Sequence, residues 1–245
     1  MLILSFIKAP AKEGLPISQD PFQADWTIAV FLLAFALLAW VRASYPFRLR
    51  SVLDCIRAPR LVRQRVRDEE AKTHPAAWAL FTVTVLSGAL FLYQHHLLYG
   101  LAFLNGPSLS TYGVCLIIIL AALLLKLLSF PFLRHLLGID PGLREYRFHF
   151  LLLIEALGIL LLPLTLFNAF LRYFRADQGL HVSFPPEWGF YISYPLMAFA
   201  FLMLIFRGIS IAKTHRVPSF YIFLYLCTLE ILPLIVLSKA FIDHY

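Results

Sequence analysis

The sequence predicts an all-α fold: a polytopic membrane helix bundle with about six transmembrane helices and one amphipathic interfacial helix. The first observation is composition, because 60% of the 245 residues are hydrophobic and only 14% are charged, whereas soluble domains carry about 25% charged residues. The second is continuity. The apolar runs are long and do not alternate with period two, which favours helices over a barrel. The mean hydropathy of +0.78 agrees with a chain whose solvent is lipid.

Each transmembrane helix needs about 20 apolar residues to cross about 30 Å of hydrocarbon. Six segments meet this requirement, and five is the nearest alternative count. The fifth contains Pro195, which predicts a broken or tilted outer end because proline removes a helix hydrogen bond. We therefore expect a short periplasmic tail (1–25) and a single transmembrane bundle (26–245). The six predicted spans are residues 26–43, 76–95, 113–132, 148–170, 190–207 and 219–240.

The distribution of lysine and arginine predicts how the chain threads the membrane, because positive residues near span ends are retained in the cytoplasm. Segments 42–75, 126–147 and 207–217 hold nine, four and three of the 21 Lys and Arg residues. If these segments are cytoplasmic, both termini face outward. In a bacterial inner membrane, both termini are then periplasmic.

The basic cytoplasmic segment 44–75 combines an apolar stripe with a dense run of arginines. Leu49, Val52, Leu53 and Ile56 recur at helical spacing, so we predict an amphipathic helix in the headgroup region. Basic residues near the surface attract anionic lipid by about 1 kcal/mol each, although they also serve simply to fix topology. No aromatic interleaving accompanies the charge, so we expect no nucleic acid partner. The predicted lipid headgroup ligands are Arg57, Arg60, Arg63, Arg65 and Arg67.

Ionisable side chains inside apolar spans need an explanation, because a charge at the bilayer centre costs about 2.5 to 3.5 kcal/mol on insertion scales. Lys126 in the third span and Glu155 in the fourth lie at similar predicted depths. A short hairpin joins these spans, so we predict that they are neighbours and that Lys126 and Glu155 form an ion pair. Gly158, which follows Glu155 by three residues, predicts the close approach of another helix.

Glu230 lies near the middle of the last predicted span, and Pro233 follows it by three residues. Because Pro233 removes the hydrogen bond to the carbonyl of Leu229, we expect a bend beside the carboxylate. Two interpretations of Glu155 and Glu230 remain open. Either these acids relay protons or bind a cation, or they are neutral or paired and fix how the helices pack.

Other polar and aromatic residues lie near the predicted span ends. His149, Asn168, Arg207 and Lys239 are expected to snorkel towards water. An aromatic belt is predicted because Tyr and Trp favour the membrane–water interface. Its members are Tyr99, Tyr112, Tyr173, Trp188 and Tyr191.

The sequence carries no standard catalytic or metal-binding signature. It has no HExxH, P-loop, GxGxxG or GxSxG motif, and its three cysteines lack the paired spacing of a zinc site or disulfide framework. His95 and His96 are adjacent, so on a helix they point about 100° apart and favour an interfacial pair over a metal site. We expect no enzyme activity, no cofactor and no metal. A lipid-modifying enzyme would have to use His95, His96 or His181.

The last span, "FYIFLYLCTLEILPLIVLSKAF", resembles the terminal helix of an uncharacterised family of multi-pass membrane proteins from the Bacteroidota, catalogued as a domain of unknown function. The similar features are a tryptophan-led first span, an arginine-rich loop and a Tyr-x-Cys-x-x-Glu-x-x-Pro signature. The resemblance implies an inner-membrane location and names no catalytic residue. The signature positions are Tyr225, Cys227, Glu230 and Pro233.

Two functions are consistent with these features. The first is a non-catalytic accessory or assembly subunit of an envelope complex, in which Glu230 and the bend at Pro233 contact the chain's own helices or those of a partner. The second is a small proton- or cation-coupled transporter in which Glu230 and Glu155 carry the coupled ion and Lys126 tunes them. The expected partners are membrane lipid, including anionic lipid, and a membrane protein or a second copy of the chain.

Overall fold

The computed structural model describes residues 25–57, 75–100, 106, 108–137, 140–177 and 188–214. Over these residues the predicted all-α fold is confirmed, because the elements formed there are all helices. The helices are α1 (Asp25–Ser44), α2 (Pro46–Arg57), α4 (Pro75–Tyr99), α5 (Leu109–Leu137), α6 (Asp140–Asp177) and α7 (Trp188–Thr214).

Five of the described helices are long and apolar enough to cross a membrane, and they match the first five predicted spans. The predicted sixth span, 219–240, lies outside the described residues, as do the tail 1–24 and most of the basic segment after α2. α2 has 12 residues and is too short to span. The span-length segments are Asp25–Ser44, Pro75–Tyr99, Leu109–Phe132, Gly142–Ala169 and Phe190–Ile211.

Local sequence signals explain where several helices begin and end. Pro46 is the first residue of α2, where a missing N–H costs nothing and the fixed φ favours a helix. Gly100 ends α4 with φ of 65° while its N–H donates to the carbonyl of His96 at 2.8 Å, a conformation that glycine adopts without strain. Ser108 caps α5, because its hydroxyl accepts a hydrogen bond from the N–H of Thr111 at 3.2 Å.

Proline does not interrupt the helices of the bundle. α7 is continuous from Trp188 to Thr214 through Pro195, so the expected break at its outer end is wrong. α6 likewise continues through Pro163 over 38 residues. A long helix held on both sides of a proline by its neighbours can lose one backbone hydrogen bond and remain helical.

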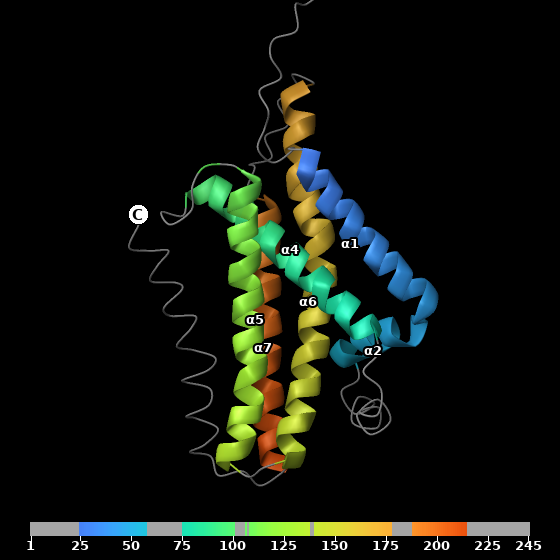
Figure 1. Ribbon diagram of the computed structural model, residues 1–245, viewed down its shortest axis with the longest axis vertical. Helices are drawn as coiled ribbons and strands as arrows, with labels where there is room; N and C mark the ends of the chain where they lie inside the picture. The colour runs from blue at the N-terminus through green and yellow to red at the C-terminus, as the bar shows by residue number, and fades with distance from the viewer. Residues whose placement is uncertain are drawn as a thin grey trace, which may run out of the picture.

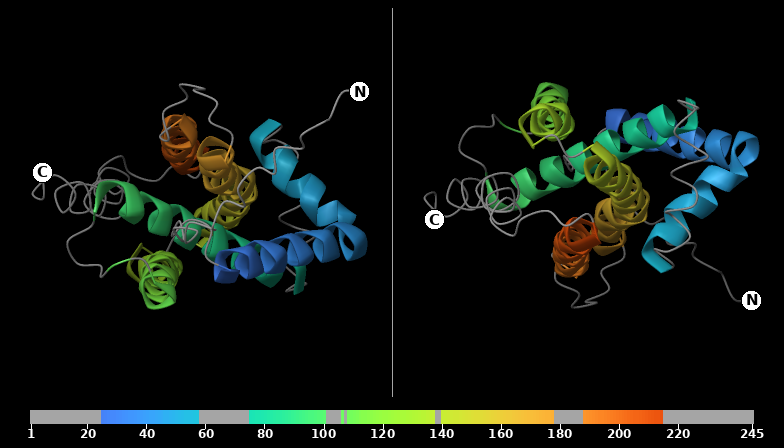
Figure 2. Two further views of the ribbon diagram at one scale, coloured as in Figure 1. Left: turned by 90° about the horizontal axis from the view of Figure 1, so that it is seen from above. Right: turned by 90° about the horizontal axis from the view of Figure 1, so that it is seen from below.

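α6 is the central helix of the bundle. α1 and α2 lie towards one side of it and α5 and α7 towards the other, while α4 crosses the bundle diagonally and passes between α5 and α7 (Figures 1 and 2). Burial follows this arrangement: 67% of the most apolar stretch of α4 and 50% of that of α6 are buried, against 11% for α5. α4 and α6 therefore form the core, and α5 exposes most of its surface.

Small residues allow the closest helix approaches. At Gly158 of α6, a Cβ atom would lie 2.6 Å from the Cα atom of Thr84 in α4, a separation that real side chains do not tolerate. The close approach predicted at Gly158 is therefore confirmed. Gly88 meets Ile119 at the contact between α4 and α5, and Gly208 meets Tyr146 between α7 and α6.

The helices do not all end at the same level. We call the end of the bundle where α5 stops at Leu137 and α6 starts at Asp140 the hairpin end. One buried cluster contains Val41 of α1, Val52 of α2, Ala76 of α4 and Leu152 of α6. Val41 and Ala76 lie near the ends of their helices, whereas Leu152 is about 18 Å of helix rise from the start of α6. α6 therefore extends beyond α1 and α4 towards the hairpin end.

Candidate functional site

The most buried charged group among the described residues is the carboxylate of Glu155 in α6, whose residue is 2% exposed. It projects where α2 and α4 both pack against α6. Leu152 and Ala156 on either side of Glu155 belong to the cluster that these helices share. This packing removes water from the carboxylate, so it needs a partner within the protein.

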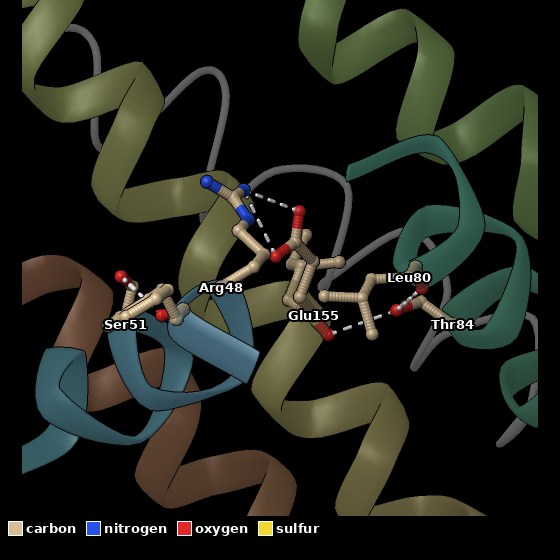
Figure 3. A network of polar contacts seen from close by, with 7 residues as sticks. Arg48, Ser51, Leu80, Thr84 and Glu155 are labelled. Carbon is tan, nitrogen blue, oxygen red and sulfur yellow. Dashed lines mark hydrogen bonds and ion pairs between the residues drawn. The ribbon is translucent and has the colours of Figure 1, made fainter. Parts of the chain in front are cut away.

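That partner is Arg48 in the first turn of α2. Its Nη2 atom donates to Oε1 of Glu155 at 2.9 Å and to Oε2 at 3.2 Å (Figure 3). Its side chain is 11% exposed, and its guanidinium lies 5.8 Å from the centroid of the Phe148 ring. The pair therefore joins the beginning of the basic segment to the middle of the central helix.

The turn between α1 and α2 directs Arg48 towards α6. The N–H of Tyr45 donates to the carbonyl of Val41 at 2.8 Å, and the N–H of Arg48 donates to the carbonyl of Tyr45 at 3.0 Å. Val52, one turn after Arg48, is buried against the bundle. The Pro46–Arg57 segment is helical as predicted, but its apolar stripe packs on protein at Val52.

A polar contact between α4 and α6 lies beside the ion pair. The hydroxyl of Thr84 donates to the carbonyl of Leu80 at 2.9 Å and lies 3.4 Å from the carbonyl oxygen of Ile154 on α6, as Figure 3 shows for the labelled Leu80 and Thr84. Ile154 is adjacent to Glu155, and Gly158 lies against Thr84. The close crossing at Gly158 thus fixes α4 on the turn of α6 that carries Glu155.

The ion pair is a strong positional lock in an apolar setting. Two opposite charges at hydrogen-bond distance nearly neutralise each other, and removing one of them leaves the other buried at a cost of about 3–5 kcal/mol. Such a pair adds little net stability compared with well-packed apolar residues of similar volume. Its chemical consequence is specificity, because α2 has one register on α6 in which Arg48 reaches Glu155.

Lys126, the predicted partner of Glu155, lies in a different place. Its Nζ atom is 5.7 Å from the centroid of the Phe150 ring. The predicted equal depths were wrong, because α5 continues to Leu137 and α6 begins at Asp140. Measured from the hairpin end, Glu155 is about 6 Å deeper than Lys126, and the contact described for its carboxylate is with Arg48.

A second set of buried polar groups lies at the opposite end of the bundle. Nε2 of Gln94 in α4 donates to the carbonyl of Thr165 in α6 at 2.8 Å. Oε1 of Gln94, both side-chain polar atoms of Asn168 and the hydroxyl of Tyr112 are buried without a hydrogen-bond partner. Gln94 and Asn168 are each 3% exposed. These atoms offer donors and acceptors to a small polar molecule or to water.

Some residues expected at the membrane–water interface are instead in protein contacts. Asn168 and His149 are each 3% exposed, so the expectation that they snorkel is wrong. Tyr112 is also buried, at the edges of Trp26 and Tyr93, and not in a surface belt. The side chain of Tyr191, by contrast, is 61% exposed. Hydropathy identifies the depth of such residues but not which neighbour faces them.

The two adjacent histidines differ in burial. His95 lies 4.7 Å, between ring centroids, from Tyr99 and stacks near Phe190 and Tyr194 of α7, and His96 is 8% exposed. In the part of the chain that the structure describes, no three His, Cys, Asp or Glu side chains are grouped so as to hold a metal ion.

Most of the remaining sequence-predicted site residues lie outside the described residues. Arg57 is the last residue of α2, and the other arginines of the predicted headgroup site follow it in the undescribed part. The residues outside are Arg60, Arg63, Arg65, Arg67, Tyr225, Cys227, Glu230 and Pro233.

Sequence reasoning missed Arg48, Thr84 and Gln94. Arg48 was one basic residue among many in segment 44–75, and its position one turn before the apolar Val52 was the available signal. Thr84 could have been matched to Gly158 as a small pair at a helix crossing. Gln94 is the sole amide in its apolar run, "LSGALFLYQ", which marks it as a polar group requiring a partner.

Comparison with known proteins places these residues in a family. A family model described as a domain of unknown function (DUF4271) matches residues 27–241. The chain belongs to this family. The DUF4271 match begins within α1 and continues past α7 through the predicted span 219–240, so Arg48, Glu155 and Lys126 all lie inside the family domain. No curated protein and no solved structure matches the chain.

Proposed function

We propose that the chain is a non-catalytic accessory or assembly subunit of an envelope complex in a bacterial inner membrane, in agreement with its resemblance to a Bacteroidota family. Five helices of spanning length support the membrane location. The family match agrees with a membrane protein built without a recognised catalytic domain.

The observation that carries this proposal is the ion pair between Arg48 and Glu155. Glu155 is one of the two acids that a coupled transporter would use, and a guanidinium from the chain's own basic segment binds it at 2.9 Å. This contact orders the first turn of the basic segment on the central helix. A fixed basic element at the membrane surface is suited to binding a partner or lipid, because its geometry is set before binding.

The orientation that we propose places the hairpin end and α2 in the cytoplasm and both termini in the periplasm. Sixteen of the 21 Lys and Arg residues lie in segments 42–75, 126–147 and 207–217, and such residues are retained on the cytoplasmic side. The arginines from Arg57 to Arg67 would then face anionic headgroups. A membrane protein or second copy would dock on exposed apolar helix faces, of which α5 has the largest share.

Purification of the tagged full-length chain in mild detergent, followed by mass spectrometry, tests the accessory role. We expect a membrane protein to co-purify in stoichiometric amounts. Arg48→Ala should reduce its recovery because the basic segment loses its anchor, whereas Arg50→Ala provides a control, since Arg50 is exposed on the same helix. Recovery of a monodisperse chain with no stoichiometric partner would contradict the accessory role.

A proton- or cation-coupled transporter is the second candidate. It is favoured by the buried polar atoms of Gln94, Asn168 and Tyr112 that have no hydrogen-bond partner, because polar groups inside spans often mark substrate or ion pathways. Reconstitution into liposomes with a trapped pH-sensitive dye tests this function. Flux that disappears in Glu155→Gln and Glu230→Gln, while the protein remains monodisperse, would favour transport over the accessory role.

A further inference from the structure

The region around Lys126 is a site for a helix that carries a negative charge. Lys126 lies within the spanning part of α5, with its Nζ atom 5.7 Å from the Phe150 ring centroid. One turn away, Phe130 packs on Phe150 with 5.5 Å between ring centroids. Around this point α5 presents apolar surface, with Leu125 70% and Leu128 66% exposed.

α7 fixes the level of this region relative to the end of the described bundle. Gly208 of α7 lies against the ring of Tyr146 in α6. Phe150 is one turn deeper than Tyr146, and Leu204 is one turn deeper than Gly208 because the two helices are antiparallel. Leu204 and Phe150 belong to the same buried cluster. The level of Lys126 is therefore that of Leu204, about 15 Å of helix rise from the end of α7 at Thr214.

The length of chain after α7 brings an acid to the same level. The predicted span 219–240 starts after Pro218, and it must run back along the bundle because α7 ends at the hairpin end. Glu230 is eleven residues beyond Ser219, so on a helix it rises about 16.5 Å from that residue. The levels of Glu230 and Lys126 then agree to within about 2 Å.

We propose that the segment 219–240 packs beside α5 and α7 and that the Glu230 carboxylate binds the Lys126 ammonium. The two side chains have opposite charges and equal depth, and an intramembrane acid is stabilised by a buried cation. The bend predicted at Pro233 falls one turn beyond the contact. This inference is independent of the proposed function, because both an accessory subunit and a transporter would need the last helix in place.

Thiol cross-linking tests the proximity directly. In a full-length chain with Cys55, Cys115 and Cys227 replaced by serine, Lys126→Cys is combined with Glu230→Cys and treated with a short bifunctional thiol reagent. A protease site inserted at residues 178–187 allows the cross-link to be scored as a chain that stays full length after cleavage. The control combines Lys126→Cys with Ser238→Cys, which lies about 12 Å farther along the helix.

We expect cross-linking within one chain for the 126–230 pair and several-fold less for the 126–238 pair. Equal cross-linking of both pairs would overturn the proposal. So would no 126–230 product in a monodisperse protein, or a product found only between two chains, which would assign the contact to a second copy.

Charge exchange tests the ion pair itself. Lys126→Glu alone and Glu230→Lys alone each place two like charges in apolar surroundings, so we expect a several-fold loss of monodisperse protein. The double exchange should recover most of it. Combining Lys126→Glu with Glu155→Lys is the matched control and should not recover it, because Glu155 lies on Arg48. Failure of the double exchange to improve on either single change would overturn the ion pair.

Discussion

The charges of Arg48 and Glu155 depend on each other, because the Glu155 carboxylate is almost fully buried and Arg48 Nη2 contacts both of its oxygens. We expect Arg48→Ala to lower the unfolding free energy by about 3–5 kcal/mol, since it leaves a buried charge unpaired. The double change Arg48→Met and Glu155→Leu should cost much less, because it removes both charges. Thermal unfolding in detergent, read by tryptophan fluorescence, measures the cycle. Additive effects of the single changes would contradict a coupled pair.

Gln94 and Asn168 form a contrasting pair of buried amides. Gln94 donates to the Thr165 carbonyl at 2.8 Å, whereas both polar atoms of Asn168 are without a hydrogen-bond partner. Gln94→Leu should therefore lower stability by about 1 kcal/mol. Asn168→Leu should leave stability unchanged or raise it, because it removes unsatisfied polar atoms. The same thermal assay measures both, and a large loss in Asn168→Leu would reveal a bound polar partner.

Residue-level contacts were the least predictable from the sequence. Glu155 was recognised as a buried acid, but Lys126 was chosen as its partner because depth was counted from assumed span ends. The true partner, Arg48, comes from a helix expected to lie in the headgroups. Hydropathy reports how deep a residue is along its own helix and carries no information on which helices are adjacent, and this limits any pairing made from sequence.

At the scale of elements, the bundle depends on a glycine at each of three helix contacts. Gly158 is the tightest, because a Cβ atom there would lie 2.6 Å from the backbone Cα of Thr84. We expect Gly158→Ala to destabilise the protein by about 1–3 kcal/mol through forced separation of α4 and α6. Gly113→Ala is the control, because its Cβ would meet nothing within 4 Å and alanine favours a helix by up to about 1 kcal/mol. Equal stability of the two variants would contradict the close crossing.

The elements themselves were largely predictable. The five described spans follow from apolar runs of sufficient length, and α2 follows from its helical stripe, which includes Val52. Pro195 misled, because its local effect on one hydrogen bond was extended to the whole end of α7. The lengths of α5 and α6 were also underestimated, since residues 133–137 and 140–147 continue the helices beyond the apolar core of each span.

At the scale of the whole molecule, the uneven helix ends distinguish two groups. α1, α2 and α4 meet α6 near Leu152, whereas α5, α6 and α7 continue together to the hairpin end through the cluster of Phe130, Tyr146 and Leu204. This step was not visible in the sequence, where each span was placed separately across one slab. It creates a level at which α2 can reach the middle of α6.

The orientation of the whole bundle is tested on the two ends of α5, which carries no soluble domain at either end. Gly106 precedes α5 and His135 lies in its last turn, and both are exposed. In a cysteine-free chain, Gly106→Cys should react with a membrane-impermeant maleimide in intact spheroplasts, whereas His135→Cys should react only after the membrane is permeabilised. The physical reason is the retention of Arg134, Arg144 and Arg147 on the cytoplasmic side. The reverse labelling pattern would invert the bundle and move the arginines after α2 to the periplasmic face, where anionic cytoplasmic lipid is out of their reach.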